Sequence, residues 1–256
     1  MYGAIIGDLA GSVYEYDQIK KVKSVKMNNV IEDNAFFSDD TVLTIAIMDA
    51  IQNNKDYNYY LRKYIEEYKD YLPNFNPYFN TLFSPNLIKW SENNYVGLSK
   101  GNGAMMRISP VGYLFDTEKE VIENAKYATM VSHNSEEAIS SATTIALVIY
   151  YLRKGLTKEE VFKKLNLEKK YIPFSKFNYT CSETMNNCLY AFYMSYSFED
   201  AIRRTLLMGG DTDTNAAIVG SMAEAIYKID EELIKKANDK LPKEFVKKLA
   251  INNKNI

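Results

Sequence analysis

Two helix starts in this sequence place clusters of oxygen-bearing side chains directly before apolar runs. One is FFSDDTVLTIAIMDAI (residues 36–51), and the other is LMGGDTDTNAAIVG (residues 207–220). A helix N-cap uses one side-chain oxygen, and acids in a first turn gain from the helix dipole. N-capping by Ser38 could therefore explain the polar residues of the first stretch if it stood alone. It does not explain why two helix starts together carry four carboxylates. The candidate metal ligands are Ser38, Asp39, Asp40, Asp211, Asp213 and Thr214.

The charge on these acids needs a partner if both apolar runs are buried. Clustered carboxylates repel, and desolvation adds a cost of several kcal/mol per ion unless they are protonated or neutralised. Oxygen-only ligands favour hard cations, and four carboxylates are enough for two Mg²⁺ or Mn²⁺ ions, with Ca²⁺ less favoured. Zinc is disfavoured because His133 is the only histidine in the chain.

The first residues of the chain carry a third set of acids. Glycines recur every fourth residue from Gly3 to Gly11, which predicts a smooth helix ridge that another helix can approach closely. On an adjoining face, Asp8, Ser12 and Glu15 fall at i, i+4 and i+7. An exposed polar stripe is one interpretation, and a packed helix whose acids need partners is the other.

The stretch LSKGNGAMMRISPVGY could bind an anion. Gly101, Asn102 and Gly103 precede a short helical pattern that contains Arg107, and backbone N–H groups in such a loop can face a phosphate. A simple turn is the alternative, since the stretch is neither a Walker A loop nor a GxGxxG fingerprint. His133 lies between two helical segments, where it is either a structural donor or a ligand contact; Ser-His-Asp hydrolysis has little support.

Helical periodicity dominates the chain and predicts an all-α protein. We expect helices over residues 57–71, 120–131, 136–153, 198–207, 216–228 and 231–241. Ser135 is a predicted N-cap, and Thr157 begins a capping-box pattern. The proline-containing connection LPNFNPYFNTLFSPN, with Pro73, Pro77 and Pro85, reads as a loop inside one domain. We therefore expect a single domain over residues 1–256, with a frayed end.

Composition limits the classes of function. The 256 residues carry a net charge of −2 and a sequence pI near 5.7, which argues against general nucleic-acid binding. The basic residues from Lys20 to Lys26 read as a solvated loop. Cys181 and Cys188 fit neither a redox motif nor a zinc site and predict free thiols in a reducing cytoplasm. The N-terminus lacks a signal-peptide pattern, and the longest apolar run, 145–152, is too short to cross a bilayer.

Five motifs together resemble one family. In order, GAIIGDLAGSVYE, FFSDDTVLTIA, SKGNGAMMRISPVGY, SHNSEEA and MGGDTDTNAAIVGSMAEAIY are similar to motifs of the ADP-ribosylglycohydrolase family, which includes dinitrogen reductase-activating glycohydrolases. The resemblance runs from Gly3 to about Tyr227. It implies a compact, orthogonal multi-helix domain with a binuclear Mg²⁺ or Mn²⁺ centre. The implied reaction cleaves the bond at C1″ of the distal ribose and releases ADP-ribose from a protein side chain or another acceptor.

The resemblance also implies residue roles. Ser38, Asp39 and Asp40 would form one half of the metal site, and Asp211, Asp213 and Thr214 the other. Glu15 would lie beside the substrate ribose, and Asp39 or Asp40 is the candidate base. The candidate substrate-binding residues, near the diphosphate, are Gly101, Asn102, Gly103, Arg107 and His133.

The sequence departs from the family pattern at two places. Bacterial members often have a second histidine and a proline where Ser135 and Glu136 stand, and Ser-Ala where Ala104 and Met105 stand. These differences bear on substrate preference rather than on the metal residues.

Two rival functions follow from the same motifs. One is a non-catalytic ADP-ribose-binding relative; the other is a MazG-like pyrophosphohydrolase, whose E-x-x-E and E-x-x-D helix pairs this chain does not present. The expected partner is an ADP-ribosylated protein or a small ADP-ribose derivative, with ADP-ribosylated nucleic acid left open. We expect a cytoplasmic monomer without membrane attachment.

Overall fold

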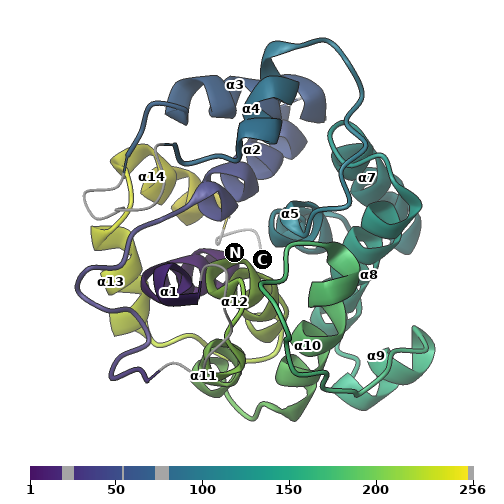
Figure 1. The fold of residues 1–256 in the computed structure, drawn as a ribbon. Coiled ribbons are helices and arrows are strands. Elements are labelled where there is room, and N and C mark those ends of the chain that lie inside the picture. Colours follow the sequence, from purple (N-terminus) through teal and green to yellow (C-terminus); the bar gives the residue numbers. More distant parts are fainter. Residues whose placement is uncertain (19–25, 54, 73–80, 253–256) are drawn as a thin grey trace.

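The first helix of the chain lies against a helix from its last quarter, and this pair forms the centre of the fold (Figure 1). The computed structural model describes residues 1–18, 26–53, 55–72 and 81–252. Helices α1 (Tyr2–Gln18) and α12 (Thr212–Ala223) approach so closely that a Cβ added at Gly3 would lie 2.1 Å from the Gly220 carbonyl oxygen. At Gly7 the same atom would lie 2.0 Å from the Ala216 oxygen. The glycine ridge predicted from the sequence is therefore a helix contact, as expected.

Twelve further helices surround this pair in the described part of the chain (Figure 1). They are α2 (Asp39–Asn53), α3 (Tyr57–Tyr68), α4 (Pro85–Glu92), α5 (Gly103–Met106), α6 (Ser109–Leu114), α7 (Glu118–Met130), α8 (Glu136–Arg153), α9 (Lys158–Lys164), α10 (Cys181–Met194), α11 (Phe198–Met208), α13 (Glu231–Asp239) and α14 (Lys243–Asn252). Among the described residues, extended pairing is limited to two isolated β-bridges, Leu98 with His133 and Gly101 with Thr180. The prediction of an all-helical single domain is confirmed.

None of the helices in the described ranges combines the length and apolar character that a membrane span requires. The predictions for Lys20, Lys21 and Lys23, for Pro73 and Pro77, and for the frayed final residues 253–256 lie outside the described residues.

Side-chain caps set several helix starts. Ser135 accepts from Ala138 N at the start of α8, and Thr157 forms the predicted capping box with Glu160 at the start of α9. The interpretation of Pro85 as part of a loop was wrong: it begins α4, with Ser84 as N-cap. Proline suits this position because it lacks an N–H that would go unpaired and its φ is already helical.

Two helices differ from the sequence-based prediction in ways that matter for the site. Helix α12 begins at Thr212 rather than Ala216, so Asp213 lies inside its first turn and Asp211 at its N-cap. Helix α10 was not predicted, although Thr180 and Glu183 form a capping box that marks its start.

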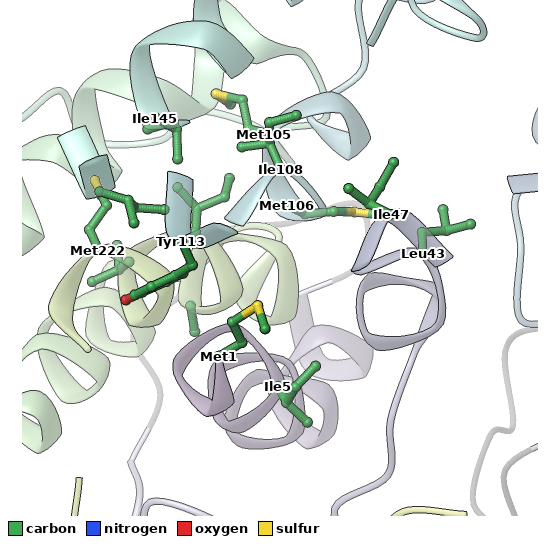
Figure 2. Close-up of a cluster of buried hydrophobic side chains, with 14 of the residues drawn as sticks. Met1, Ile5, Leu43, Ile47, Met105, Met106, Ile108, Tyr113, Ile145 and Met222 are labelled. Atoms are coloured by element: carbon green, nitrogen blue, oxygen red, sulfur yellow. The ribbon is translucent and has the colours of Figure 1, made fainter. Parts of the chain in front are cut away.

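Buried hydrophobic side chains from most of the helices form one connected core, part of which is drawn in Figure 2. Figure 2 shows buried side chains from α1, α2, α5, α6, α8 and α12 in one cluster, together with Met1, which precedes α1, and Ile108, which lies between α5 and α6. The labelled residues are Met1, Ile5, Leu43, Ile47, Met105, Met106, Ile108, Tyr113, Ile145 and Met222. Leu43 and Met106 also line the cavity that contains the candidate site, so this core forms part of the cavity wall.

Candidate functional site

One cavity of about 870 Å³ gathers the residues that the sequence singled out. Its size is within the range of pockets that enclose small organic ligands. The predicted site residues that line it are Glu15, Ser38, Asp39, Asp40, Gly101, Asn102, Gly103, Arg107, His133, Asp211, Asp213 and Thr214. The structure thus brings together every residue of the predicted site, from segments far apart in the chain.

At one end of the cavity, which we call the acid end, two groups of carboxylates meet. Asp8, Asp40 and Asp213 each offer an oxygen within 4.8 Å of the others, and Glu15, Asp211 and Asp213 form a second such group. Asp213 belongs to both groups. Asp40 at the start of α2 and Asp211 at the start of α12 are therefore linked through one shared carboxylate.

Asp8 is a member of this cluster that the sequence analysis left without a role. Its side chain is fully buried on α1, where its Oδ2 atom accepts from Ser38 N at 2.9 Å and from Thr41 N at 3.1 Å. The Thr41 hydroxyl donates to the same oxygen. Asp8 therefore caps the start of α2 from a neighbouring helix. The glycine ridge around it was the available signal, because a closely packed helix buries the acid beside its glycines.

In the described part of the chain, burial and the neighbouring carboxylates outweigh any positive charge near these acids. Burial, together with the charge of Asp213, raises the pKa of Asp8 from 3.8 to about 7. The same two causes raise the pKa of Asp39 to about 8, although Arg107 opposes this shift. Burial first, and then neighbouring carboxylates, also raise the pKa of Asp40, Asp213 and Glu15. The cluster is thus a site where a cation would be strongly favoured over separate ionised acids.

Unused oxygen atoms show that the acid end fits such ions. Asp8 Oδ1 and Asp40 Oδ1 are buried and have no hydrogen-bond partner. The hydroxyls of Ser38 and Thr214 lie 3.1 Å and 3.3 Å from Asp40 Oδ2, which adds neutral oxygens to the same place. An all-oxygen set with a shared carboxylate suits a pair of hard divalent cations such as Mg²⁺ or Mn²⁺.

The glycine loop lies beside the acid end and is anchored on both sides. Asn102 N donates to Tyr179 O at 3.0 Å, and Cys181 N donates to Lys100 O at 2.9 Å. The Asn102 side chain donates from Nδ2 to Asp211 Oδ2 at 2.7 Å. The loop predicted to bind an anion is therefore in direct contact with a predicted metal ligand.

His133 and Arg107 form a buried pair next to this loop. Arg107 Nη2 donates to Ser132 Oγ at 2.7 Å, and that hydroxyl lies 2.8 Å from His133 Nδ1. Arg107 Nη2 also lies 3.4 Å from His133 Nδ1, and because a guanidinium can only donate, Nδ1 is assigned as the acceptor and the imidazole proton to Nε2. Burial, and then the Arg107 charge, hold the His133 pKa well below 6.5. His133 is therefore a neutral N–H donor.

Each residue of this pair has one donor atom for which no protein acceptor is found among the described residues. A Cβ added at Gly101 or Gly103 would lie 3.5 Å or 3.6 Å from His133 Nε2, so this atom faces the loop. Arg107 Nη1 is buried without a partner, and burial lowers the Arg107 pKa to about 10, which leaves it charged at neutral pH. We call this part of the cavity, from Gly101 to Gly103 with Arg107 and His133, the loop end. It can stabilise an anion.

The wall beyond the loop end is apolar and aromatic. Trp90, Tyr95, Leu98 and Tyr179 line it, and the Tyr179 side chain is 57% exposed at the rim. Arg62 on α3 stacks over the Trp90 ring at 4.2 Å and donates to the Trp90 carbonyl at 2.7 Å, which fixes the end of α4. Such a wall can accept a planar ring.

The chain matches a protein family and several known proteins. The sequence profile of the ADP-ribosylglycohydrolase family covers residues 1–251. An ADP-ribosyl-[dinitrogen reductase] glycohydrolase from Rhodospirillum rubrum is 26% identical over 51% of this chain, and that match spans 47% of the relative's length. A putative ADP-ribosyl glycohydrolase from Acanthamoeba polyphaga mimivirus is 24% identical over 88% of this chain and 84% of its own.

More distant matches extend over the same length. ADP-ribosylhydrolase ARH3 from Mus musculus is 20% identical over 90% of this chain and 83% of its own. A solved structure described as an ADP-ribosylglycohydrolase-related protein complex superposes with a TM-score of 0.69, at 18% identity, over 98% of this chain and 91% of its own. That likeness establishes the fold.

Proposed function

The chain belongs to the ADP-ribosylglycohydrolase family, and on this premise we propose that it is a metal-dependent hydrolase that releases ADP-ribose from an acceptor by cleaving the bond at C1″ of the distal ribose. The observation that carries the proposal is that three kinds of group line one cavity. They are a cluster of carboxylates, N–H donors that adjoin this cluster where Asn102 contacts Asp211, and aromatic side chains. These groups suit the ribose, the diphosphate and the adenine of ADP-ribose.

The loop end would bind the diphosphate. His133 would donate from Nε2 and Arg107 from its unpartnered Nη1. A fixed neutral donor and a buried guanidinium suit this task because neither must lose its hydration when the ligand arrives. Tyr179 or Tyr95 would stack on the adenine at the exposed rim.

The acid end would hold two Mg²⁺ or Mn²⁺ ions. The residues that would bind them are Asp40, Asp211 and Asp213, with the unpartnered Oδ1 atom of Asp8 and the hydroxyls of Ser38 and Thr214. Such ions, when bound, neutralise the carboxylates, orient the ribose hydroxyls and lower the pKa of a bound water. Asp8 would offer its Oδ1 atom to the ions while its Oδ2 atom caps the start of α2.

Two carboxyls remain for proton transfer. Asp39 lines the cavity, is half-buried and belongs to neither group of three, whereas Asp40 already accepts from Ser38 and Thr214. Asp39 is thus the better candidate for the base that takes a proton from the attacking water. Glu15, whose pKa is raised by burial and by the nearby aspartates, can keep a proton for the departing acceptor atom.

The water oxygen would form a bond to C1″ while the bond from C1″ to the acceptor breaks. The acceptor class remains a prediction: an ADP-ribosylated protein, a small ADP-ribose derivative or an ADP-ribosylated nucleic-acid end. The expectation that the chain acts as a monomer also stays a prediction.

Mass spectrometry of released ADP-ribose tests the proposal. A panel of ADP-ribosylated arginine, serine and nucleic-acid substrates is incubated with the chain and Mg²⁺ or Mn²⁺, and again with a chelator. We expect release from at least one substrate and its loss with the chelator. Tight binding of free ADP-ribose without release from any substrate would instead support a non-catalytic binding protein.

A further inference from the structure

The backbone of Asp211 is held by a buried side chain that has no part in the proposed chemistry. Asn178, which is 1% exposed, accepts from Asp211 N at its Oδ1 atom, at 2.9 Å. The preceding residue, Gly210, has φ +76°, and a Cβ there would lie 2.1 Å from the same oxygen. A side chain at position 210 would therefore displace Asn178, and the glycine admits the amide to the start of α12.

Asn178 is the centre of a closed hydrogen-bond network, which we call the amide network and which comprises Asn102, Asn178, Thr184 and Asn215. The Asn178 Nδ2 atom donates to Thr184 Oγ1 at 2.8 Å and to Asn215 Oδ1 at 2.9 Å, so both of its protons are used. Asn215 Nδ2 in turn donates to Gly209 O at 3.3 Å. Because the donors are satisfied in one arrangement, each amide fixes the orientation of its neighbour.

The network joins the two ends of the cavity. Thr184 Oγ1 accepts from Asn178 Nδ2 and, at 3.4 Å, from Asn102 Nδ2. The other proton of Asn102 Nδ2 goes to Asp211 Oδ2 at 2.7 Å. A ring of contacts thus runs from the Asp211 backbone through Asn178, Thr184 and Asn102 to the Asp211 carboxylate.

We propose that Asn178 is a positioning residue that aligns Asp211 at the acid end with Asn102 at the loop end, acting through Thr184. The ring of contacts fixes the distance between a metal ligand and the loop that would bind the diphosphate. All its members are buried, and the link from the Asp211 backbone to Asn102 runs only through amides and a hydroxyl that carry no charge. This role rests on the proposed function.

Calorimetric titration with Mn²⁺, and with ADP-ribose at saturating Mn²⁺, tests the role. Asn178→Ala leaves Asp211 N without its acceptor, and we expect both affinities to fall by about tenfold or more. Thr184→Val keeps the volume but removes the acceptor for Asn178 and Asn102. It should weaken ADP-ribose binding more than Mn²⁺ binding, and Thr184→Ser should restore both.

Asn124→Ala is the matched control. Asn124 is also a buried asparagine with both side-chain atoms bonded, to Tyr57 and to the Glu120 carbonyl, but it lies on α7 away from the cavity. It should lower the melting temperature and leave both affinities unchanged.

The outcomes separate the two proposals. A wild-type chain that binds neither Mn²⁺ nor ADP-ribose would overturn the proposed function, and the positioning role with it. A wild-type chain that binds both, with Asn178→Ala and Thr184→Val no weaker than Asn124→Ala, would overturn the positioning role alone. Should Asn178→Ala fail to fold, the Thr184→Val and Thr184→Ser pair still decides.

Discussion

The acid end and the loop end of the cavity are adjacent, yet they are stabilised in opposite ways. At the acid end, carboxylates of like charge lie buried together, and two of their oxygens have no partner. At the loop end, His133 is neutral, and a hydroxyl of Ser132 lies between it and the charged Arg107. We therefore expect bound protons or bound cations to stabilise the acid end, whereas hydrogen bonds within the protein already order the loop end.

This difference separates two kinds of contribution to binding. Removing charge at the acid end should relieve repulsion in the metal-free protein while abolishing metal binding. Removing a donor at the loop end should weaken the ligand and leave the metal-free fold almost unaffected. At the acid end, substitutions should thus raise the stability of the metal-free protein while they weaken metal binding. At the loop end, they should weaken ligand binding without such a gain in stability.

The double substitution Asp211→Asn with Asp213→Asn should have the largest effect. It removes a carboxylate from both groups and should abolish Mn²⁺ binding and release of ADP-ribose together. The metal-free variant should nevertheless melt at a higher temperature than the metal-free wild type, because two buried like charges are gone. Calorimetry and thermal melts in a chelator measure these effects. Retained turnover in this variant would refute the metal assignment.

The stability of the metal-free protein should depend on pH. Because the pKa of Asp8 is raised to about 7 and that of Asp39 to about 8, the folded state binds protons more tightly than the unfolded chain. The free energy of unfolding should therefore be highest at low pH and fall as pH rises through these values, by on the order of a few kcal/mol.

Denaturant titrations in a chelator and in Mg²⁺ check this dependence. The stabilisation by Mg²⁺ should be greater at about pH 8 than at about pH 5, since protons and cations compete for the same oxygens. A Mg²⁺ increment that is constant with pH, or a metal-free stability that rises towards pH 8, would contradict a buried cluster of ionisable acids.

The acid end was the more predictable part of the site. Residue types at the helix starts were sufficient to predict that Asp40, Asp211 and Asp213 lie in one cluster. Capping requires one side-chain oxygen, and the carboxylates before these apolar runs are more than that. Asp8 was not assigned because it lies inside α1. Its burial depends on the approach of α12, and its two backbone partners lie 30 and 33 residues away.

The sequence was sufficient to predict which residues form the loop end, but not the hydrogen bonds that they make. The proton position on His133 depends on Ser132 and on the buried Arg107, and Asn102 reaches Asp211 across 109 residues. The aromatic residues of the wall could not be predicted from the sequence for a different reason. The chain has 33 tyrosines and phenylalanines, and only the fold selects the few that line the cavity.

His133→Ala should weaken ADP-ribose binding by about tenfold, as expected for the loss of one donor to a charged group. Mn²⁺ binding should not change, because His133 belongs to neither carboxylate group. His133→Gln, which can still donate an N–H, should lose less affinity. Since the histidine is neutral in the folded protein, the wild-type affinity should not rise as pH falls from about 8 to about 6 through protonation of its imidazole. An affinity that rises in this range, and loses the rise in His133→Gln, would contradict the neutral donor.

The smallest effect should come from Ser135, one of the positions that depart from the family pattern. Its hydroxyl caps α8 by accepting from Ala138 N and also donates to Ser99 O at 3.0 Å, beside the loop end. Ser135→Ala should lower the free energy of unfolding by about 1 kcal/mol and weaken ADP-ribose binding by about threefold. Thr157→Ala removes a comparable cap from α9, whose start does not line the cavity, and should cost similar stability without changing affinity. Denaturant titration and calorimetry on the two variants compare them directly. Equal loss of affinity in both would mean that the Ser135 contact with the loop end acts only through general stability.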